Sequence, residues 1–226
     1  MTKVAFFVDG HFLFRKVSQF KSFFVDGPGI RAYCLRHLKE HESVYRIFYY
    51  DCPPFERSAD TPFGKNVNFA ETESAKRKKA LLESIRETPE MALRLGKISW
   101  QNDWVIKPEK LKELIGGKIT KFIDNDFSPN FRQKAVDIKI GLDIATITYK
   151  KFAGRIVLIA GDSDFTPAAK LARVEGMHIT LDPLGNPVSE DLLEHIDVMH
   201  CCLDPDNPND VVNTQRRFFA LCKKDI

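Results

Sequence analysis

The residues of this sequence best suited to chemistry are aspartates that directly follow apolar segments. Asp9 follows Val4–Val8, and Asp162 and Asp164 follow Arg155–Ala160. Strands of one parallel sheet end at the same edge, and this edge borders the functional crevice of an open α/β sheet. We therefore expect the three carboxylates to converge.

Two further aspartates lie in the segment KAVDIKIGLD. Asp137 is embedded among apolar residues, where a carboxylate is costly to bury unless it is paired or binds a metal ion. Asp143 follows six residues later, which corresponds to about 240° around a helix. Asp137 is thus the fourth candidate for the site, and Asp143 is expected at an edge of it.

A group of four or five carboxylates without interspersed Cys or His suits hard cations such as Mg²⁺ or Mn²⁺. Phosphoryl transfer needs such a site, because a bound cation activates water and stabilises the oxygens of a phosphodiester. Without a cation the carboxylates would repel one another and a nucleic acid backbone. The pattern therefore indicates metal-dependent chemistry on phosphodiesters.

Simpler interpretations of the same residues stay open. An Asp after a strand, as in GDSDF, is more often a turn residue or a helix cap than a catalytic group. The basic run Lys76–Lys79 is more often a solvated helix face than a nucleic acid track. The histidines are better explained as local hydrogen-bonding residues than as ligands; these are His11, His178, His195 and His200.

The elements that must position the aspartates are predicted from apolar runs and helical spacing. Continuous apolar runs predict buried strands; these are Val4–Val8, Val44–Tyr50, Arg155–Ala160 and Met177–Leu181, with a short last strand at Val198–His200. Helices are predicted at Pro28–His41, Phe69–Arg86 and Pro108–Ile115, from Thr166 to Gly176, and from Ser189 through His195. This alternation predicts an α/β fold, a doubly wound parallel sheet with helices on both faces.

The remaining segments give weaker signals. Cys52–Asn68 is rich in Pro, Gly and polar residues and is predicted to be a long loop. Met91–Leu95 is predicted to be a short helix that ends at Gly96, and Lys97–Ile106 a strand. Lys118–Gln133 is irregular. A linker at Asp204–Asn209 precedes a predicted short helix at Val211–Cys222.

The segment Lys134–Phe152 fits two periodicities. Its apolar residues alternate like those of a strand, but they also form two helical stripes. A segment of this length exceeds the usual strand, and a helix that is apolar on two sides is one that is largely buried. The prediction is therefore a helix.

Composition excludes several classes of protein. The 226 residues include 34 Lys+Arg and 31 Asp+Glu, a net charge of +3 that is too balanced for a histone-like coat on nucleic acid. No apolar run approaches the roughly 18–20 residues of a membrane span. The first residues resemble no secretory signal, and five irregularly spaced cysteines without a CxxC pair favour reduced thiols over disulfides or a zinc site. A cytoplasmic location is expected.

Three motifs in order carry a family resemblance. VDG at Val8–Gly10, KAVDIKIGLD at Lys134–Asp143 and LIAGDSDFTP at Leu158–Pro167 resemble the NYN domain of LabA-like proteins, within the PIN-like ribonuclease superfamily. SEDLLEHID at Ser189–Asp197 is similar to the closing helix of that family, and RLGKI at Arg94–Ile98 loosely matches it. The resemblance covers about residues 3–200 and leaves the tail from Cys201 unexplained. The predicted organisation is a nuclease domain over residues 1–200, followed by a C-terminal linker and short helix over 201–226.

The resemblance also implies what the site does. It implies cleavage of RNA with Mg²⁺ or Mn²⁺, with Asp9, Asp137, Asp162 and Asp164 as catalytic metal ligands. Asp143 matches a further acidic position of the family and is predicted as an additional metal ligand. It supports the helix at Lys134–Phe152. One departure is that the family often has Asn where this sequence has Phe12, which removes a polar group beside the metal site.

The resulting hypothesis is a cytoplasmic, metal-dependent ribonuclease. Basic residues near the motifs are candidates for holding the RNA; they are Lys76, Arg77, Lys78, Lys79, Arg132, Lys134 and Lys139. The alternative is a catalytically weak RNA-binding or adaptor module, motivated by Phe12 and by a tail that could bind a protein partner or a second copy. An aspartyl phosphatase ranks lower, because His11 and Leu13 replace the second Asp and the Thr of DxDxT.

Overall fold

The computed structural model of the chain describes residues 1–17, 25–202 and 214–216. These residues form two compact units. Unit 1 comprises residues 1–51, 81–95 and 135–226, and unit 2 comprises residues 52–80 and 96–134. The described part of the chain contains no helix that is long and apolar enough to cross a membrane.

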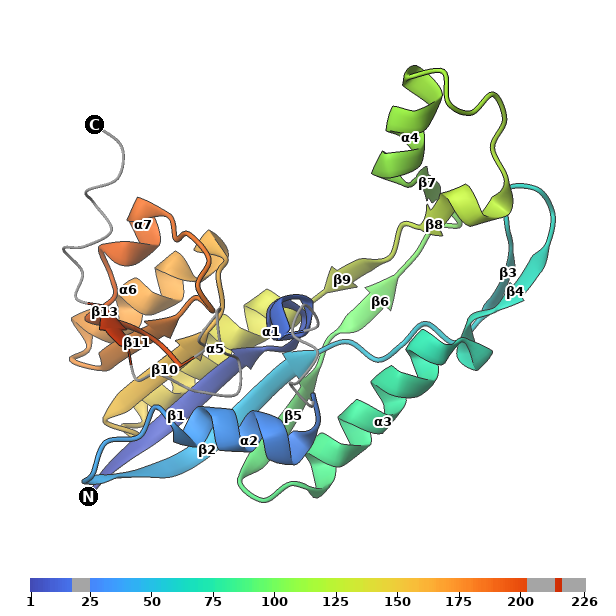
Figure 1. Cartoon of the computed structure of the whole chain (residues 1–226). Coiled ribbons are helices and arrows are strands. Elements are labelled where there is room, and N and C mark those ends of the chain that lie inside the picture. Colours follow the sequence, from blue (N-terminus) through green and yellow to red (C-terminus); the bar gives the residue numbers. More distant parts are fainter. Residues whose placement is uncertain (18–24, 203–213, 217–226) are drawn as a thin grey trace, which may run out of the picture. The chain divides into compact units, whose positions relative to one another are not determined.

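Unit 1 is built on a seven-stranded sheet (Figure 1). Its strands are β1 (Thr2–Asp9), β2 (Glu42–Asp51), β5 (Met91–Leu95), β10 (Arg155–Ile159), β11 (His178–Asp182), β12 (Val198–Cys201) and β13 (Thr214–Arg216). The strand order is β13-β12-β11-β10-β1-β2-β5, and six strands run parallel while β13 pairs antiparallel with β12. The predicted doubly wound parallel sheet is confirmed.

Helices cover both faces of this sheet. They are α1 (Gly10–Val17), α2 (Gly27–Leu35), α3 (Glu73–Glu87), α5 (Val136–Tyr149), α6 (Thr166–Val174) and α7 (Glu190–Leu193), with the 3₁₀ turn η3 (Ser163–Phe165) before α6. On one face, Phe6 and Val8 of β1 share an apolar core with α1, α2 and the second half of α3. On the other face, Phe7 stacks on Phe48 and Tyr50, and α5 packs against β1, β2 and β5. Figure 1 shows α2 and α5 on opposite sides of the sheet.

The burial of β1 explains why its sequence is a continuous apolar run. Residues Val4–Val8 are completely buried, because β1 lies between β10 and β2 and is covered on both faces. A strand in this position has no solvent-facing side and needs no polar alternation. Val8 pairs with Ile159 of β10 and Asp9 with Tyr50 of β2, so the three strands end at nearly the same level.

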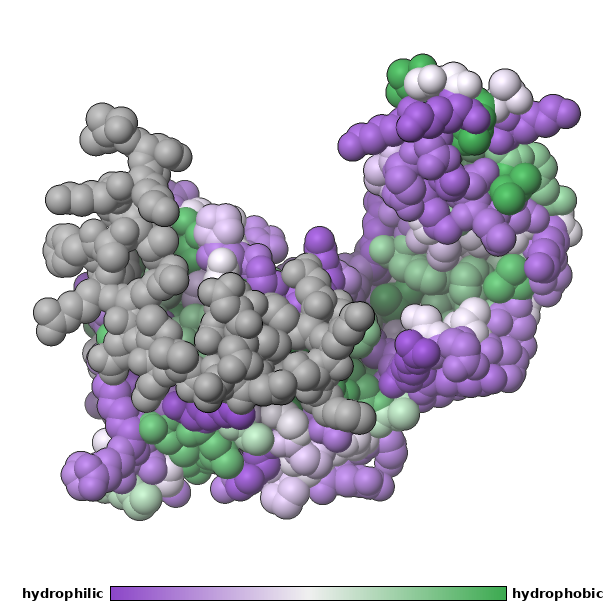
Figure 2. Space-filling model, viewed as in Figure 1, coloured by the Kyte–Doolittle hydropathy of each residue, from purple (hydrophilic) through white to green (hydrophobic). Residues whose placement is uncertain are grey.

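Unit 2 contains three short antiparallel strand pairs and an aromatic core. Its elements are β3 (Ser58–Asp60), β4 (Asn66–Asn68), η1 (Phe69–Glu71), the start of α3, β6 (Lys97–Ser99), β7 (Trp104–Ile106), α4 (Pro108–Ile115), η2 (Asp124–Asp126), β8 (Phe127–Pro129) and β9 (Arg132–Lys134). Five rings pack edge to face or tilted, with centroids 5.1–6.1 Å apart; they are Phe55, Phe69, Trp100, Trp104 and Phe131. Figure 2 shows hydrophobic residues among hydrophilic ones over α4, where Leu111 and Ile115 are exposed.

Several local predictions are wrong. Met91–Leu95 forms the edge strand β5 rather than a helix, because pairing with β2 satisfies its backbone and buries Met91 in the core. Part of Cys52–Asn68 is the β3–β4 hairpin rather than a loop, and Lys97–Ile106 is split into β6 and β7. Within the predicted helix Val211–Cys222, residues 214–216 form β13, and the rest lies outside the described residues, as does most of the 201–226 tail.

Candidate active site

Three neighbouring strands bring carboxylates to one edge of the sheet. Asp9 ends β1, Asp51 ends the adjacent β2, and Asp162 follows β10 on the other side of β1. This convergence is a consequence of parallel pairing, which places all carboxyl ends together. Helix α5 adds Asp137 in its first turn, packed beside β1 and η3.

Asp9 caps the helix that follows it. Its Oδ1 accepts a hydrogen bond from the backbone N–H of Phe12 at 3.1 Å, the geometry of an N-cap side chain at the third helical residue. The pKa of Asp9 is raised to about 6, chiefly by burial and also by the nearby charges of Asp137 and Asp51, against the lowering effect of the backbone N–H groups of Phe12 and His11. The carboxylate of Asp9 is therefore held in an environment that disfavours its charge.

The other three aspartates are coupled to one another. Asp162 Oδ1 accepts a hydrogen bond from the backbone N–H of Asp164 at 3.0 Å, which fixes the turn η3. The pKa of Asp137 is raised by partial burial and by the charges of Asp162 and Asp164. Asp9 interacts with Asp137, and Asp137 with the other two, so the structure brings together all four predicted catalytic residues. We call this group the aspartate cluster (Asp9, Asp137, Asp162 and Asp164).

Asp143 is held by different partners. Its Oδ2 accepts hydrogen bonds from Tyr50 Oη at 2.8 Å and from Arg94 Nε at 3.1 Å. These contacts connect α5 to β2 and β5, and they place the positive charge of Arg94 beside the Asp143 carboxylate. The predicted role of Asp143 as a metal ligand stays a prediction, and the observed contacts favour a positioning role for α5.

A crevice of about 550 Å³ opens beside the aspartate cluster. Its lining comes from the start of α1, the turn after β10 and the segment before α7, and comprises Asp9, His11, Phe12, Arg15, Lys16, Gly161, Asp162, Ser163, Asn186 and Ser189. Lys16 Nζ donates to Asn186 Oδ1 at 3.2 Å. The lining of the crevice thus combines two carboxylates, Asp9 and Asp162, with two basic residues, Arg15 and Lys16.

Phe12 forms part of the crevice wall and fits closely over Gly161. A Cβ atom added at Gly161 would lie 2.5 Å from Phe12 Cε2, a separation that requires the ring to move. We expect Gly161→Ala to reduce the free energy of unfolding by about 1–3 kcal/mol, because overpacking a rigid site forces side chains out of position. Urea denaturation measures this loss.

A double-mutant cycle provides the control for this contact. Adding Phe12→Ala to Gly161→Ala removes the ring that the new methyl group meets. The cost of the alanine at position 161 is then expected to be much smaller in the Phe12→Ala background. Equal costs in both backgrounds would contradict the close contact.

The basic residues predicted from sequence lie in both units. Lys139 belongs to α5 in unit 1, where its Nζ donates to the Leu95 carbonyl at 2.6 Å. In unit 2, Lys76 lies near two glutamates and Lys79 pairs with Glu56 at 3.0 Å. The remaining predicted residues, Arg77, Lys78, Arg132 and Lys134, also belong to unit 2. Their role in binding nucleic acid stays a prediction.

Sequence reasoning missed three residues of this region. Asp51 is completely buried at the end of β2, and its Oδ2 lies 3.4 Å from Tyr49 Oη. The rule applied to Asp9, an aspartate that ends a buried strand, would also have selected it. Arg15 and Lys16 follow VDG within two helical turns, and their position just after the first strand end was the available signal.

Comparison with known families identifies the family of the chain. The NYN domain model matches residues 3–193, which cover most of both units. The chain belongs to the NYN family. NYN domains are generally nuclease-like, and NYN nucleases typically use divalent metal ions. Membership of this family therefore indicates a nuclease-like class of function. A nucleic acid is the class of substrate that corresponds to it.

The fold is also similar to that of a solved structure. It is the crystal structure of a protein of unknown function from Vibrio parahaemolyticus, with a TM-score of 0.51 and 14% sequence identity over 91% of this chain and 94% of that chain. At this identity the similarity shows the fold alone. Comparison with curated proteins found no match.

The aspartate cluster of this NYN domain fits the divalent ion that the family implies. All four donors are carboxylates, which Mg²⁺ and Mn²⁺ prefer. Burial and the negative charges of neighbouring aspartates raise the pKa of both Asp9 and Asp137, so the environment of these two carboxylates disfavours their charge. A cation would supply compensating positive charge, and its four ligands would be the members of the cluster.

Proposed function

We propose that this NYN domain is a ribonuclease that hydrolyses RNA phosphodiester bonds with Mg²⁺ or Mn²⁺. The observation that carries the proposal is the electrostatic coupling of four aspartates from β1, α5 and the turn after β10, beside an open crevice. When bound, the cation supplies Lewis acidity that activates water and stabilises charge on the phosphate.

The residues of the chain position that chemistry. The aspartate cluster holds the cation from three elements whose relative positions the sheet fixes. Arg15 and Lys16 line the same crevice, and their positive charges attract the phosphate backbone of the RNA. This attraction offsets the repulsion between the phosphates and the aspartates. Asn186 orients Lys16 through its side-chain oxygen.

A cleavage assay tests the proposal. Labelled single-stranded RNA, double-stranded RNA and single-stranded DNA of one sequence are incubated with the full chain in Mg²⁺, Mn²⁺ or EDTA. We expect RNA cleavage in Mg²⁺ or Mn²⁺ and none in EDTA. Cleavage that persists in EDTA, or that an identically prepared Asp162→Asn variant retains, would contradict the proposal.

The second candidate function is an RNA-binding or adaptor module with weak catalysis. Phe12 favours it, because this side chain stands where the family often has a polar Asn and packs on Gly161 in the crevice. In the same assay, binding of RNA without cleavage in either cation would select this alternative. Restored cleavage in a Phe12→Asn variant would then identify Phe12 as the cause.

Lys16 provides a separate test of how the crevice binds nucleic acid. We expect Lys16→Gln to weaken RNA binding by a similar factor for all sequences and to reduce the slope of log K against log salt by about 1, because one phosphate contact is lost. Binding is measured in EDTA over a range of KCl concentrations. Lys170→Gln, an exposed lysine on α6, is the matched control and should leave the slope unchanged.

A further inference from the structure

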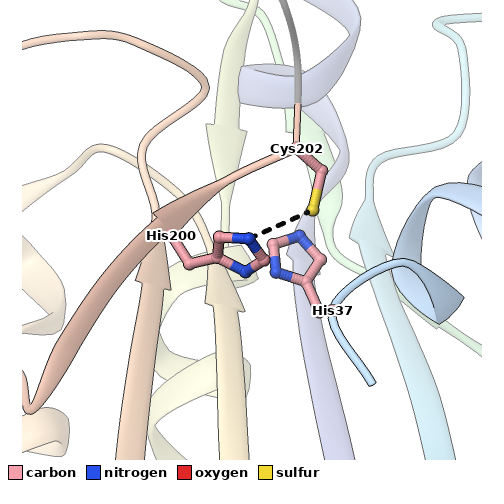
Figure 3. A group of neighbouring side chains, drawn as sticks. All are labelled: His37, His200 and Cys202. Atoms are coloured by element: carbon pink, nitrogen blue, oxygen red, sulfur yellow. Dashed lines mark hydrogen bonds between the residues drawn. The ribbon is translucent and has the colours of Figure 1, made fainter. Parts of the chain in front are cut away.

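A second group of side chains suited to metal binding lies in the interior of unit 1. His37, His200 and Cys202 each offer one ligand atom, and these atoms all lie within 4.8 Å of one another (Figure 3). The three residues are 2%, 7% and 1% exposed. His37 follows α2, His200 belongs to β12, and Cys202 follows that strand, so the fold joins two distant parts of the sequence.

His37 presents one ring nitrogen that is buried and unsatisfied. Its Nε2 lies 3.1 Å from Asp182 Oδ2, while its Nδ1 has no hydrogen-bond partner in the described part of the chain. A buried polar atom without a partner is unfavourable, and such atoms are rare in folded proteins. A carboxylate on one ring nitrogen and a metal ion on the other is the usual arrangement of a metal-binding histidine.

Asp182 and Arg155 hold His37 in this position. Asp182 is completely buried at the end of β11 and also accepts hydrogen bonds from Tyr33 Oη and from the backbone N–H of Leu184. Arg155 donates to the His37 carbonyl at 2.7 Å and pairs with Glu42 at 2.5 Å. Both the ring and the backbone of His37 are therefore fixed before any ion binds.

The other two side chains approach the same point. Cys202 Sγ lies 3.9 Å from His200 Nε2, and the rings of His37 and His200 meet edge to face with centroids 4.9 Å apart. Figure 3 shows the cysteine sulfur and both imidazole rings directed toward one another. Two imidazoles and a thiol are borderline or soft ligands, which suit Zn²⁺ rather than Mg²⁺ or Mn²⁺.

We propose that His37, His200 and Cys202 bind a Zn²⁺ ion that is structurally separate from the aspartate cluster. The thiol of Cys202 loses its proton to solvent on binding, and the thiolate forms the bond to zinc. The thiolate and the Asp182 carboxylate balance the charge of the ion, and Asp182 acts as a positioning residue for His37. Because the ligands are buried, the ion fastens β12 to the segment after α2 and stabilises unit 1.

Metal analysis of the full chain tests this site. The protein is exposed to Zn²⁺, passed through gel filtration, and its metal content is measured by mass spectrometry. We expect about one tightly held zinc per chain. Replacement of zinc by Co²⁺ should give the thiolate-to-cobalt charge-transfer band and the intense visible bands of a tetrahedral site. Absence of both zinc and these bands in the wild type would overturn the proposal.

Variants identify the ligands and separate them from other thiols and imidazoles. We expect Cys202→Ser to lose the charge-transfer band and His37→Gln to lose tight zinc binding. Asp182→Asn should keep the band but weaken zinc affinity by about 10–100-fold, as for a residue that orients a ligand. The matched controls Cys201→Ser and His178→Asn should behave like the wild type. Full zinc content in Cys202→Ser would contradict the assignment.

Two further measurements keep the site testable if a variant does not fold. At a urea concentration at which the metal-free wild type exposes the buried Cys202 to alkylation in peptide mapping, zinc should protect this thiol, and equal modification with zinc or EDTA would contradict the site. Asp162→Asn should retain its zinc, because this residue belongs to the aspartate cluster. Zinc binding without RNA cleavage in the wild type would contradict the proposed function alone. RNA cleavage without zinc binding would contradict this inference alone.

Discussion

Asp137→Asn and Asp162→Asn are each expected to reduce metal-dependent RNA cleavage at least about 100-fold. Residues that only orient metal ligands already contribute about 10–100-fold in many enzymes, so removal of a ligand charge should cost at least the upper value. Each substitution keeps the size of the side chain and removes one negative charge from the aspartate cluster. Initial rates at saturating Mg²⁺ and Mn²⁺ measure the loss.

The control for this prediction must remove a carboxylate from another part of unit 1. Glu175, which follows α6, is exposed and lines a separate pocket together with Gly176 and Lys3. Glu175→Gln should therefore cleave RNA like the wild type. Thermal melting in EDTA checks that all variants are folded. A rate for Asp162→Asn within a factor of a few of the wild type would contradict the assignment of this residue as a ligand.

Asp9→Asn is expected to make the metal-free protein more stable at neutral and alkaline pH. The pKa of Asp9 is about 6 in the folded chain against an ordinary value of 3.8, so the native state binds more protons than the unfolded state between these values. The free energy of unfolding of the wild type therefore falls as pH rises from about 4 to about 6. An uncharged Asn avoids this loss, which corresponds to about 1–3 kcal/mol at pH 8.

Asn also preserves the local structure at this position. It is as good an N-cap residue as Asp, so the hydrogen bond to the backbone of Phe12 can be kept. Urea denaturation in EDTA at about pH 4 and pH 8 measures the effect. The advantage of Asp9→Asn should be large at pH 8 and nearly absent at pH 4. A variant that is less stable than the wild type at pH 8 would contradict the argument.

Divalent cations should reverse this order. Mg²⁺ or Mn²⁺ binds the native wild type and stabilises it by mass action, whereas the Asp9→Asn site has lost one carboxylate ligand. We therefore expect the wild type to gain more stability than the variant when the cation is added at pH 8. Equal gains would show that the cation binds elsewhere.

The sequence by itself determined five strands of the central sheet and the four aspartates of the candidate site. Val4–Val8 and Arg155–Ala160 are continuous apolar runs because strands buried on both faces need no polar side, and an aspartate at such a strand end is visible in the sequence. The length of Lys134–Phe152 selected a helix where periodicity was divided, and α5 confirms it. These features depend on local burial patterns, which a sequence records directly.

The secondary structure of short segments was decided by the strands with which they pair. Met91–Leu95 has an apolar composition that suits a helix or a strand, and only its pairing with β2 makes it β5. The hairpin β3–β4 and the separate strands β6 and β7 likewise depend on cross-strand pairs within unit 2. Local propensity is too weak to settle segments of three to five residues, because tertiary contacts contribute more free energy.

Only the tertiary structure decided which distant residues meet. Strand order placed the buried Asp51 beside Asp9, and the start of α1 placed Lys16 in the crevice. The tertiary structure also brought His37 close to His200 and Cys202, although the spacing of the cysteines in the sequence did not indicate a metal site. Such encounters depend on chain topology and on helix packing across the sheet, which no local pattern in the sequence encodes.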